Sequence, residues 1–206
     1  ALAITDHGPG HLTYGIKRSA IPVMRREIER LKPLYPTLDI YLGVEANFIN
    51  RGNCLDVTKE EAAQYDFILG GYHYGVTRGY CIRNYLDTHL PTGFGTGSLL
   101  KKNTEMALTA IYENEIKILT HPGDKGPFDV LEMAKACAKR GTLMEISTWH
   151  SHLTVEEIKI AAKTEVRFVI SSDAHSPKRV GTFWGGVERV LAAGLDMDRV
   201  VNIARL

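Results

Sequence analysis

The stretch Val169-Ile170-Ser171-Ser172-Asp173-Ala174-His175 decides the fold, because an apolar run ends there in residues that bind metals. Four further segments have the same form: Ala3-Ile4-Thr5-Asp6-His7, Leu42-Gly43-Val44-Glu45, Leu69-Gly70-Gly71-Tyr72-His73 and Ile118-Leu119-Thr120-His121. Each apolar run has the composition of a buried parallel strand. In a β/α barrel the carboxyl ends of such strands meet on one face, where the loops form the active site. The five segments therefore predict a barrel with its functional site on that face.

Strand candidates alternate with helical patterns along the whole chain. The strands are expected at residues 1–5, 38–44, 66–72, 116–120, 142–147 and 167–171. Between them, Thr58-x-x-Glu61 and Thr154-x-x-Glu157 have the form of capping boxes at helix starts. The alternation implies parallel strands joined by right-handed crossovers. We predict an α/β protein with a distorted seven-stranded (β/α) barrel that lacks its first βα unit. A doubly wound sheet is the alternative architecture.

The length and composition favour one enzyme-sized domain. The 206 residues are 44% hydrophobic and 24% charged, which is ordinary for a single α/β domain over residues 1–206. The chain opens inside a strand pattern and without Met, so we expect an N-terminally incomplete catalytic domain. No apolar run approaches the roughly 20 residues of a membrane span. The net charge of +1 gives no electrostatic basis for nucleic-acid binding, and Cys54, Cys81 and Cys137 lack paired spacing. We expect a cytoplasmic protein that binds neither membranes nor nucleic acid.

Six residues at the predicted strand ends are candidate metal ligands: His7, Glu45, His73, His121, Asp173 and His175. A single histidine in such a position is more often an ordinary core or surface residue, so the argument rests on the shared location. Asp173 and His175 point to the same side of an extended segment because strand side chains alternate with a period of two. Mixed imidazole and carboxylate ligands suit zinc, iron and manganese, and a carboxylate can bridge two ions. The pattern predicts a metal cluster.

Other polar residues near the strand ends have less definite interpretations. Asp6 is expected to face away from the cluster and to support it from outside, while Glu145 either orients a ligand or belongs to the barrel packing. Four histidines lie in predicted loops and are interpreted as solvated: His11, His89, His150 and His152. Of these, His11 and His150 are closest to strand ends and are candidates for substrate contact. The glycines of Gly93–Gly97 indicate a mobile lid or a plain loop, with a phosphate-binding loop as the alternative.

Cationic side chains follow three of the predicted ligands. Arg78 comes five residues after His73, Lys125 comes four residues after His121, and Arg179 follows His175 closely. Any one of them alone is better interpreted as a solvated surface charge. Three loops that each bring a cation to one metal cluster favour a phosphate-bearing substrate.

Several segments resemble motifs of the PHP (polymerase and histidinol phosphatase) superfamily. They are Ile4-Thr5-Asp6-His7-Gly8, Gly43-Val44-Glu45, Gly71-Tyr72-His73, Thr120-His121-Pro122-Gly123 and Ser171-Ser172-Asp173-Ala174-His175-Ser176. The resemblance extends over nearly the whole chain in the same order. It implies a distorted seven-stranded barrel that holds two or three divalent metal ions, typically zinc, manganese or iron, and hydrolyses phosphoesters.

The resemblance also implies a role for each candidate ligand. Glu45 would bridge two metals, and His73 with His121 would complete one of these sites. Asp173 would hold the other metal beside Glu45, and His7 with His175 would hold a third. The family's first motif, a His-x-His, would lie before Ala1 and is not in this sequence. Only the site formed by Glu45, His73 and His121 is then complete.

These considerations predict metal-dependent hydrolysis of a phosphomonoester, as in a histidinol phosphatase, by a metal-bound hydroxide. Asp173 and His175 are assigned to catalysis, and Arg78, Lys125 and Arg179 are assigned to binding a small phosphorylated substrate. Two alternatives remain open. One is a PHP-type nuclease or proofreading exonuclease. The other is a non-catalytic barrel that acts as a binding module, which the missing first motif suggests.

Overall fold

Six parallel strands form one sheet in the computed structural model, which describes residues 1–90 and 96–203. The strands are β1 (Leu2–Ile4), β2 (Ile40–Asn47), β3 (Phe67–Gly71), β4 (Ile116–Leu119), β5 (Leu143–Ser147) and β6 (Phe168–Ser171). Their order in space follows their order in the chain, and each strand pairs in parallel with the next. This order excludes the doubly wound alternative, in which the strand order reverses within the sheet.

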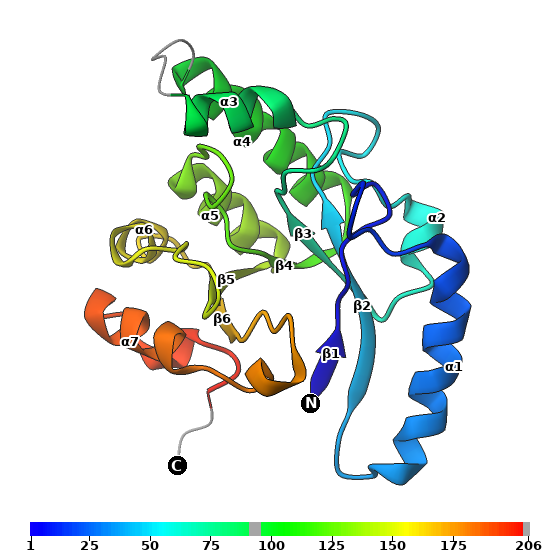
Figure 1. Cartoon of the computed structure of the whole chain (residues 1–206). Helices are drawn as coiled ribbons and strands as arrows, with labels where there is room; N and C mark the ends of the chain where they lie inside the picture. Colours follow the sequence, from blue (N-terminus) through cyan, green and yellow to red (C-terminus); the bar gives the residue numbers. More distant parts are fainter. Residues whose placement is uncertain (91–95, 204–206) are drawn as a thin grey trace.

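The sheet curls into a half-barrel that stays open between β1 and β6 (Figure 1). The prediction of parallel strands in a barrel-like α/β fold is confirmed, but the described residues contain six strands and not seven. The barrel does not close because no strand of the described ranges pairs with the free edge of β1. The sheet is therefore an open trough in which the carboxyl ends of the strands lie together.

Helices surround the outside of the curled sheet (Figure 1). They are α1 (Ile21–Leu31), α2 (Lys59–Ala62), α3 (Cys81–His89), α4 (Thr96–Glu113), α5 (Val130–Arg140), α6 (Val155–Ala161) and α7 (Trp184–Ala193). Both predicted capping boxes are confirmed, since Thr58 and Glu61 open α2 and Thr154 and Glu157 open α6 with reciprocal hydrogen bonds. Within the described part of the chain, no helix is both long and apolar enough to cross a membrane.

Strand β2 shows how the sequence positions the site. Leu42, Val44 and Ala46 are fully buried on one side of the strand and belong to the apolar core. The side chains of Glu45 and Asn47 point to the other side, because strand side chains alternate, and both are buried there as well. A strand buried on both faces thus carries polar groups into the interior, which is costly unless they are paired.

Residues 93–95 of the Gly93–Gly97 segment lie outside the described residues, and the expectation of a lid or loop concerns that part of the chain.

Candidate metal centre

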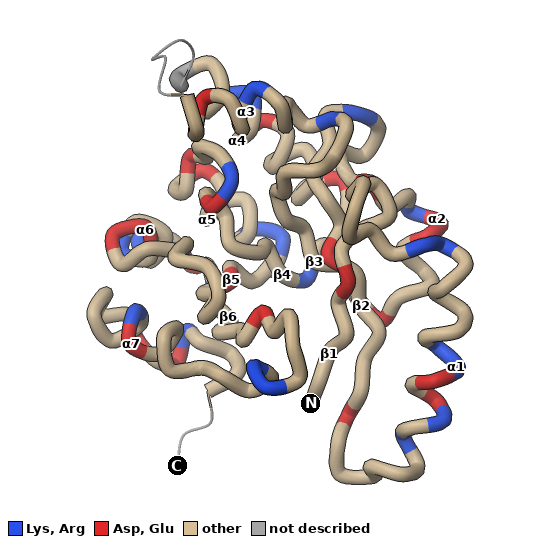
Figure 2. The backbone as a smooth tube through the Cα atoms, viewed as in Figure 1, with Lys and Arg blue, Asp and Glu red and all other residues tan. Residues whose placement is uncertain are grey.

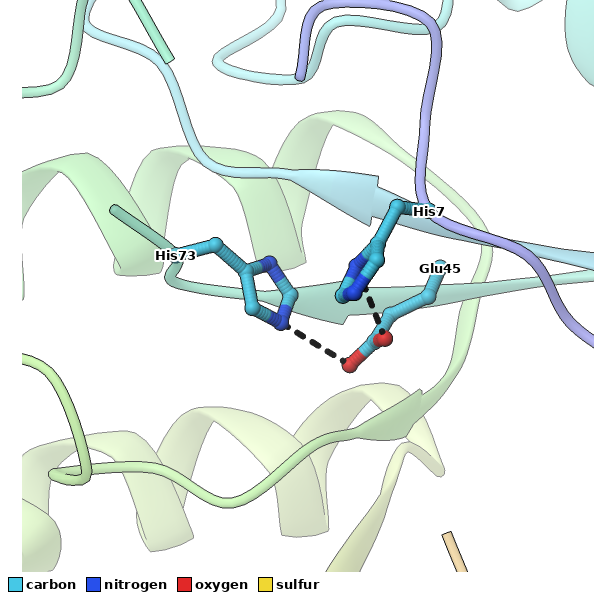
Figure 3. Close-up of side chains that lie close together, drawn as sticks. All are labelled: His7, Glu45 and His73. Carbon is cyan, nitrogen blue, oxygen red and sulfur yellow. Dashed lines mark ion pairs between the residues drawn. The ribbon is translucent and has the colours of Figure 1, made fainter. Parts of the chain in front are cut away.

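Three of the predicted ligands meet at the carboxyl ends of the first three strands. His7 follows β1, Glu45 lies in β2 and His73 follows β3, and one ligand atom from each lies within 4.8 Å of the others. Figure 3 shows the two imidazoles next to each other, each facing one oxygen of the Glu45 carboxylate. Glu45 Oε2 is 3.4 Å from His7 Nδ1, and Glu45 Oε1 is 3.3 Å from His73 Nε2. The structure thus brings these three side chains together as the sequence predicts.

His121, which follows β4, joins the same carboxylate. Its Nε2 is 3.1 Å from Glu45 Oε1 and 3.2 Å from His73 Nε2. The atoms Glu45 Oε1, His73 Nε2 and His121 Nε2 are therefore 3.1 to 3.3 Å apart in every pair. Ligands bound tetrahedrally to zinc at about 2.0 to 2.1 Å are separated by about 3.4 Å. The spacing and the chemistry of this donor set fit a divalent transition metal.

Space for these side chains depends on Gly71 at the end of β3. A Cβ atom at this position would lie 2.8 Å from His73 Cε1 and 3.0 Å from Glu45 Oε1, and it would also overlap Thr120 Oγ1. Contacts this close to backbone-anchored side chains force a shift of the site. Glycine is therefore required here for steric reasons.

Asn47 fixes the orientation of His73, and sequence reasoning missed this role. The amide nitrogen of Asn47 donates to Asp56 Oδ2 (2.6 Å) and Gly8 O (3.3 Å), which leaves its Oδ1 facing His73 Nδ1 at 2.9 Å. His73 Nδ1 then donates to Asn47 Oδ1, and its Nε2 faces Glu45 Oε1 and His121 Nε2. A hydrogen bond on the opposite ring nitrogen is the usual arrangement for a metal-binding histidine.

The electrostatics of the cluster follow from an ionised carboxylate in a buried position. Burial opposes ionisation of Glu45, but His73 and His121 outweigh it and hold the pKa of the carboxyl well below its usual value. Burial also disfavours the charged form of His121, yet its hydrogen bond to Glu45 raises the pKa to about 9. The pKa of His7 is lowered to about 4, first by burial and then by His73. At neutral pH His7 is a neutral imidazole with a free lone pair.

Glu145, on β5, orients a ligand through the main chain. Its Oε2 accepts a hydrogen bond from the backbone N–H of His121 at 2.8 Å, and its Oε1 accepts one from the Ser171 hydroxyl at 2.5 Å. Burial raises the pKa of Glu145 to about 7. His121 and Asp173 both have positive φ angles, 23° and 44°, which are unfavourable for residues other than glycine. Of the two interpretations left open for Glu145, the contacts favour the orienting role.

A second group forms on the other side of His121. Ligand atoms of His121, His150 and Asp173 lie within 4.8 Å of one another. His150 Nε2 is 3.3 Å from Asp173 Oδ2, and the ring centroids of His150 and His121 are 4.4 Å apart. The interpretation of His150 as a solvated loop residue is wrong, because its side chain is only 17% exposed. It turns inward because Ser147 Oγ accepts the backbone N–H groups of Trp149 and His150, which bends the chain directly after β5.

His175 and Asp6 are less closely associated with the cluster. The His175 side chain is 51% exposed and stacks on Trp149 with ring centroids 5.2 Å apart, while its centroid is 6.5 Å from that of His7. Asp6 is exposed, and its main-chain oxygen accepts the N–H of Glu45. His11 lies beside the site and stacks on His7 at 5.1 Å.

Two of the three predicted phosphate-binding cations lie next to these residues. Lys125 Nζ is 2.5 Å from Asp124 Oδ2, and the same oxygen is 3.0 Å from His150 Nδ1. The guanidinium of Arg179 lies over the ring of Trp149 at 4.2 Å from its centroid. Arg78 is exposed in the loop after β3, and none of its described contacts joins it to the cluster.

The sequence is similar over nearly its full length to proteins named as phosphatases. It is 25% identical over 214 residues to a "Probable phosphatase" of Shewanella frigidimarina, covering 97% of this chain and 75% of that protein. It is 26% identical over 211 residues to a "Probable phosphatase" of Syntrophotalea carbinolica, covering 98% and 78%. It is also 26% identical over 216 residues to "Probable phosphatase YcdX" of Escherichia fergusonii, covering 98% and 77%. No family model matches the sequence. The relatives' names support phosphatase activity in general.

Proposed function

We propose that this protein is a metal-dependent phosphatase of the PHP superfamily that hydrolyses a phosphomonoester, as a histidinol phosphatase does. The observation that carries the proposal is the mutual approach of Glu45 Oε1, His73 Nε2 and His121 Nε2 to within 3.1 to 3.3 Å at the ends of three strands. Similarity to proteins named as probable phosphatases supports the reaction class.

The proposed centre holds two or three divalent ions, which would be zinc, manganese or iron. Glu45, His73 and His121 hold one ion, and Asp173 holds a second beside Glu45. His7 and His175 contribute to a third. When bound, such ions supply a nucleophilic oxygen at neutral pH and neutralise the charge that develops on the phosphoryl group. The lowered pKa values of Glu45 and His7 and the contact between His73 Nδ1 and Asn47 Oδ1 support the donor roles.

The remaining side chains bind and orient the substrate. Lys125, Arg179 and Arg78 attract the phosphate oxygens, and the first two flank the cluster through Asp124 and Trp149. His175 is exposed enough to meet a substrate, so we assign it to catalysis together with Asp173.

The distribution of charge supports a small phosphorylated substrate over a polyanion. The net charge is +1, and Figure 2 shows basic and acidic positions interspersed along α1, α6 and α7. Many of these charges form local pairs, such as Arg30 with Glu27 and Lys159 with Glu156. Nucleic-acid binding depends mainly on unpaired cations that contact phosphates.

The test combines metal analysis with hydrolysis assays on protein purified without chelators. We expect two or three divalent ions per chain and release of phosphate from histidinol phosphate or other small phosphomonoesters. Activity should disappear after chelation and return with zinc, manganese or iron. Single-stranded DNA belongs in the same panel, since release of nucleotides would favour the nuclease alternative. Metal-loaded protein that hydrolyses none of these compounds would refute the proposal and favour a binding module.

A further inference from the structure

The turn after β5 carries a histidine that the ligand assignment above leaves out. His150 Nε2 is 3.3 Å from Asp173 Oδ2, and its Nδ1 is 3.0 Å from Asp124 Oδ2. The imidazole therefore lies between two carboxylates, and one face of it contacts the ring of His121. In the assignment above, the ion beside Asp173 has only carboxylate ligands from this chain. An imidazole 3.3 Å from Asp173 is well placed to complete its coordination.

The chemistry of the two carboxylates indicates which nitrogen of His150 is free. Asp124 Oδ2 also lies 2.5 Å from Lys125 Nζ, so this carboxylate contacts the ammonium of Lys125 as well as the His150 ring. His150 Nδ1 lies 3.0 Å from Asp124 Oδ2, which leaves Nε2 as the nitrogen that faces Asp173. Nε2 and Asp173 Oδ2 then lie on either side of a position that a metal ion or a proton can occupy. An imidazole whose other nitrogen is held by a carboxylate is a recurrent arrangement at metal sites.

The loop that carries His150 is fixed by contacts from two neighbouring elements. Arg189, on α7, donates to the carbonyl oxygens of Ser151 and Leu153 at 2.7 Å each, and it also contacts the carbonyl of Ser147. Ser147 Oγ donates to Asp173 Oδ2 at 3.3 Å as well as accepting the His150 N–H. The two donor residues are therefore held in register by the same hydroxyl. Such support keeps ligands in a productive geometry without help from a metal.

We propose that His150 Nε2 is a metal ligand that completes, with Asp173, a second cation position beside the one at Glu45, His73 and His121, and that Asp124 orients it. This inference rests on the proposed metal-dependent function. It adds an imidazole to the position where the centre lacks one, and it gives Asp124 the role of a positioning residue.

Cobalt(II) binding tests the proposal, because cobalt reports its ligands by visible absorption independently of catalysis. We compare the wild-type protein with His150→Gln and with His152→Gln as the matched control. His152 lies two residues further along the same loop and pairs with Glu157 at 3.0 Å. For His150→Gln we expect the affinity for one cobalt ion to fall at least tenfold and the visible band of that ion to shift. His152→Gln should bind cobalt with the wild-type affinity and spectrum. Asp124→Asn should lower the affinity for the same ion by a smaller factor and leave the affinity for the other ions unchanged.

A cysteine substitution gives a positive signal and does not depend on the glutamine variant being folded. With cobalt bound, His150→Cys should show a new thiolate-to-cobalt charge-transfer band that is absent from the wild type and from His152→Cys. Unchanged stoichiometry, affinity and spectrum in His150→Gln, or no new band in His150→Cys, overturns the inference. If these results accompany metal-dependent phosphatase activity in the wild type, only the role of His150 fails. If the wild-type protein binds no cobalt, both proposals fail.

Discussion

The two sides of the cluster are built in different ways. On the side of β2, β3 and β4, Glu45, His73 and His121 are buried, and the strands themselves set the spacing of their donor atoms. On the side of β5 and β6, His150 and Asp173 project from turns and both form hydrogen bonds with the Ser147 hydroxyl. The first side is fixed by the sheet together with contacts from residues in its strands, and the second side is fixed mainly by contacts within loops.

The difference indicates how a metal centre can combine rigidity with access. Strand-borne ligands keep their geometry through the backbone pairing of the sheet, so they suit an ion that stays bound. Loop-borne ligands lie nearer to solvent, and the exposed His175 and Trp149 neighbour them. We therefore expect substrate to approach from the β5–β6 side. Substitutions on each side test this division between tightly held ligands and substrate access.

Glu45→Gln should have the largest effect of any single substitution. The carboxylate contacts His7 through one oxygen and His73 and His121 through the other, so a neutral amide weakens two metal positions at once. We expect the affinity for metal to fall by more than about 100-fold, since loss of an outer contact alone costs ten- to a hundredfold. Elemental analysis and phosphatase assays check this, with His89→Ala as a surface control. Full metal content in Glu45→Gln would show that the carboxylate does not bridge.

The pH dependence of metal binding should report the protonation of His121, the ligand that follows β4. In the metal-free protein the pKa of His121 is raised to about 9, so a proton occupies the ligand position at neutral pH. A metal must displace that proton, and the apparent affinity should therefore rise about tenfold per pH unit below pH 9. Between pH 6 and pH 8 this amounts to about 100-fold. Zinc titrations against a chelating indicator measure it, and His121→Gln should bind weakly with a flatter profile. A slope near zero in the wild type would contradict the assignment.

The fold and the β2–β4 side of the centre could be predicted from the sequence, since both follow from a repeated local signal. An apolar run followed by a metal-binding residue places that residue at the carboxyl end of a parallel strand, and parallel strands bring those ends together. His7, Glu45, His73 and His121 all carry this signal and all meet. The expected parallel order of strands holds for the same reason, and closure of the barrel depends on pairing at the free edge of β1.

The β5–β6 side could not be predicted in the same way, because it depends on contacts between residues distant in sequence. A serine at a strand end can form a turn with the residues that follow it, as Ser147 does with His150, but the sequence does not show that this turn brings His150 to Asp173. Asn47 was missed because its partner His73 is 26 residues away. His175 carries the strongest sequence signal on this side, yet its half-exposed ring stacks on Trp149.

Removal of Glu145 should affect stability more than chemistry. Glu145→Ala leaves the buried backbone N–H of His121 without its acceptor, and an unsatisfied buried donor costs about 1 to 3 kcal/mol in unfolding free energy. Glu145→Gln retains an acceptor oxygen and should lose less. Urea unfolding of the metal-free variants at pH 6 measures the difference. Equal stability of Glu145→Ala and the wild type would mean that the His121 backbone does not need this contact.

Arg179→Ala should have the smallest effect, and it tests whether substrate reaches the centre from the β5–β6 side. Its guanidinium lies over Trp149 at the exposed side of the centre, so it contributes charge to substrate binding and touches none of the buried ligands. We expect KM for a phosphomonoester to rise about tenfold with kcat within about twofold, which is the signature of lost uniform binding. Lys178→Ala, one residue earlier and exposed, is the matched control and should leave both constants unchanged. An equal fall in kcat would instead place Arg179 at the reacting phosphoryl group, and substrate would then reach deeper between the two sides than the exposed position of Trp149 implies.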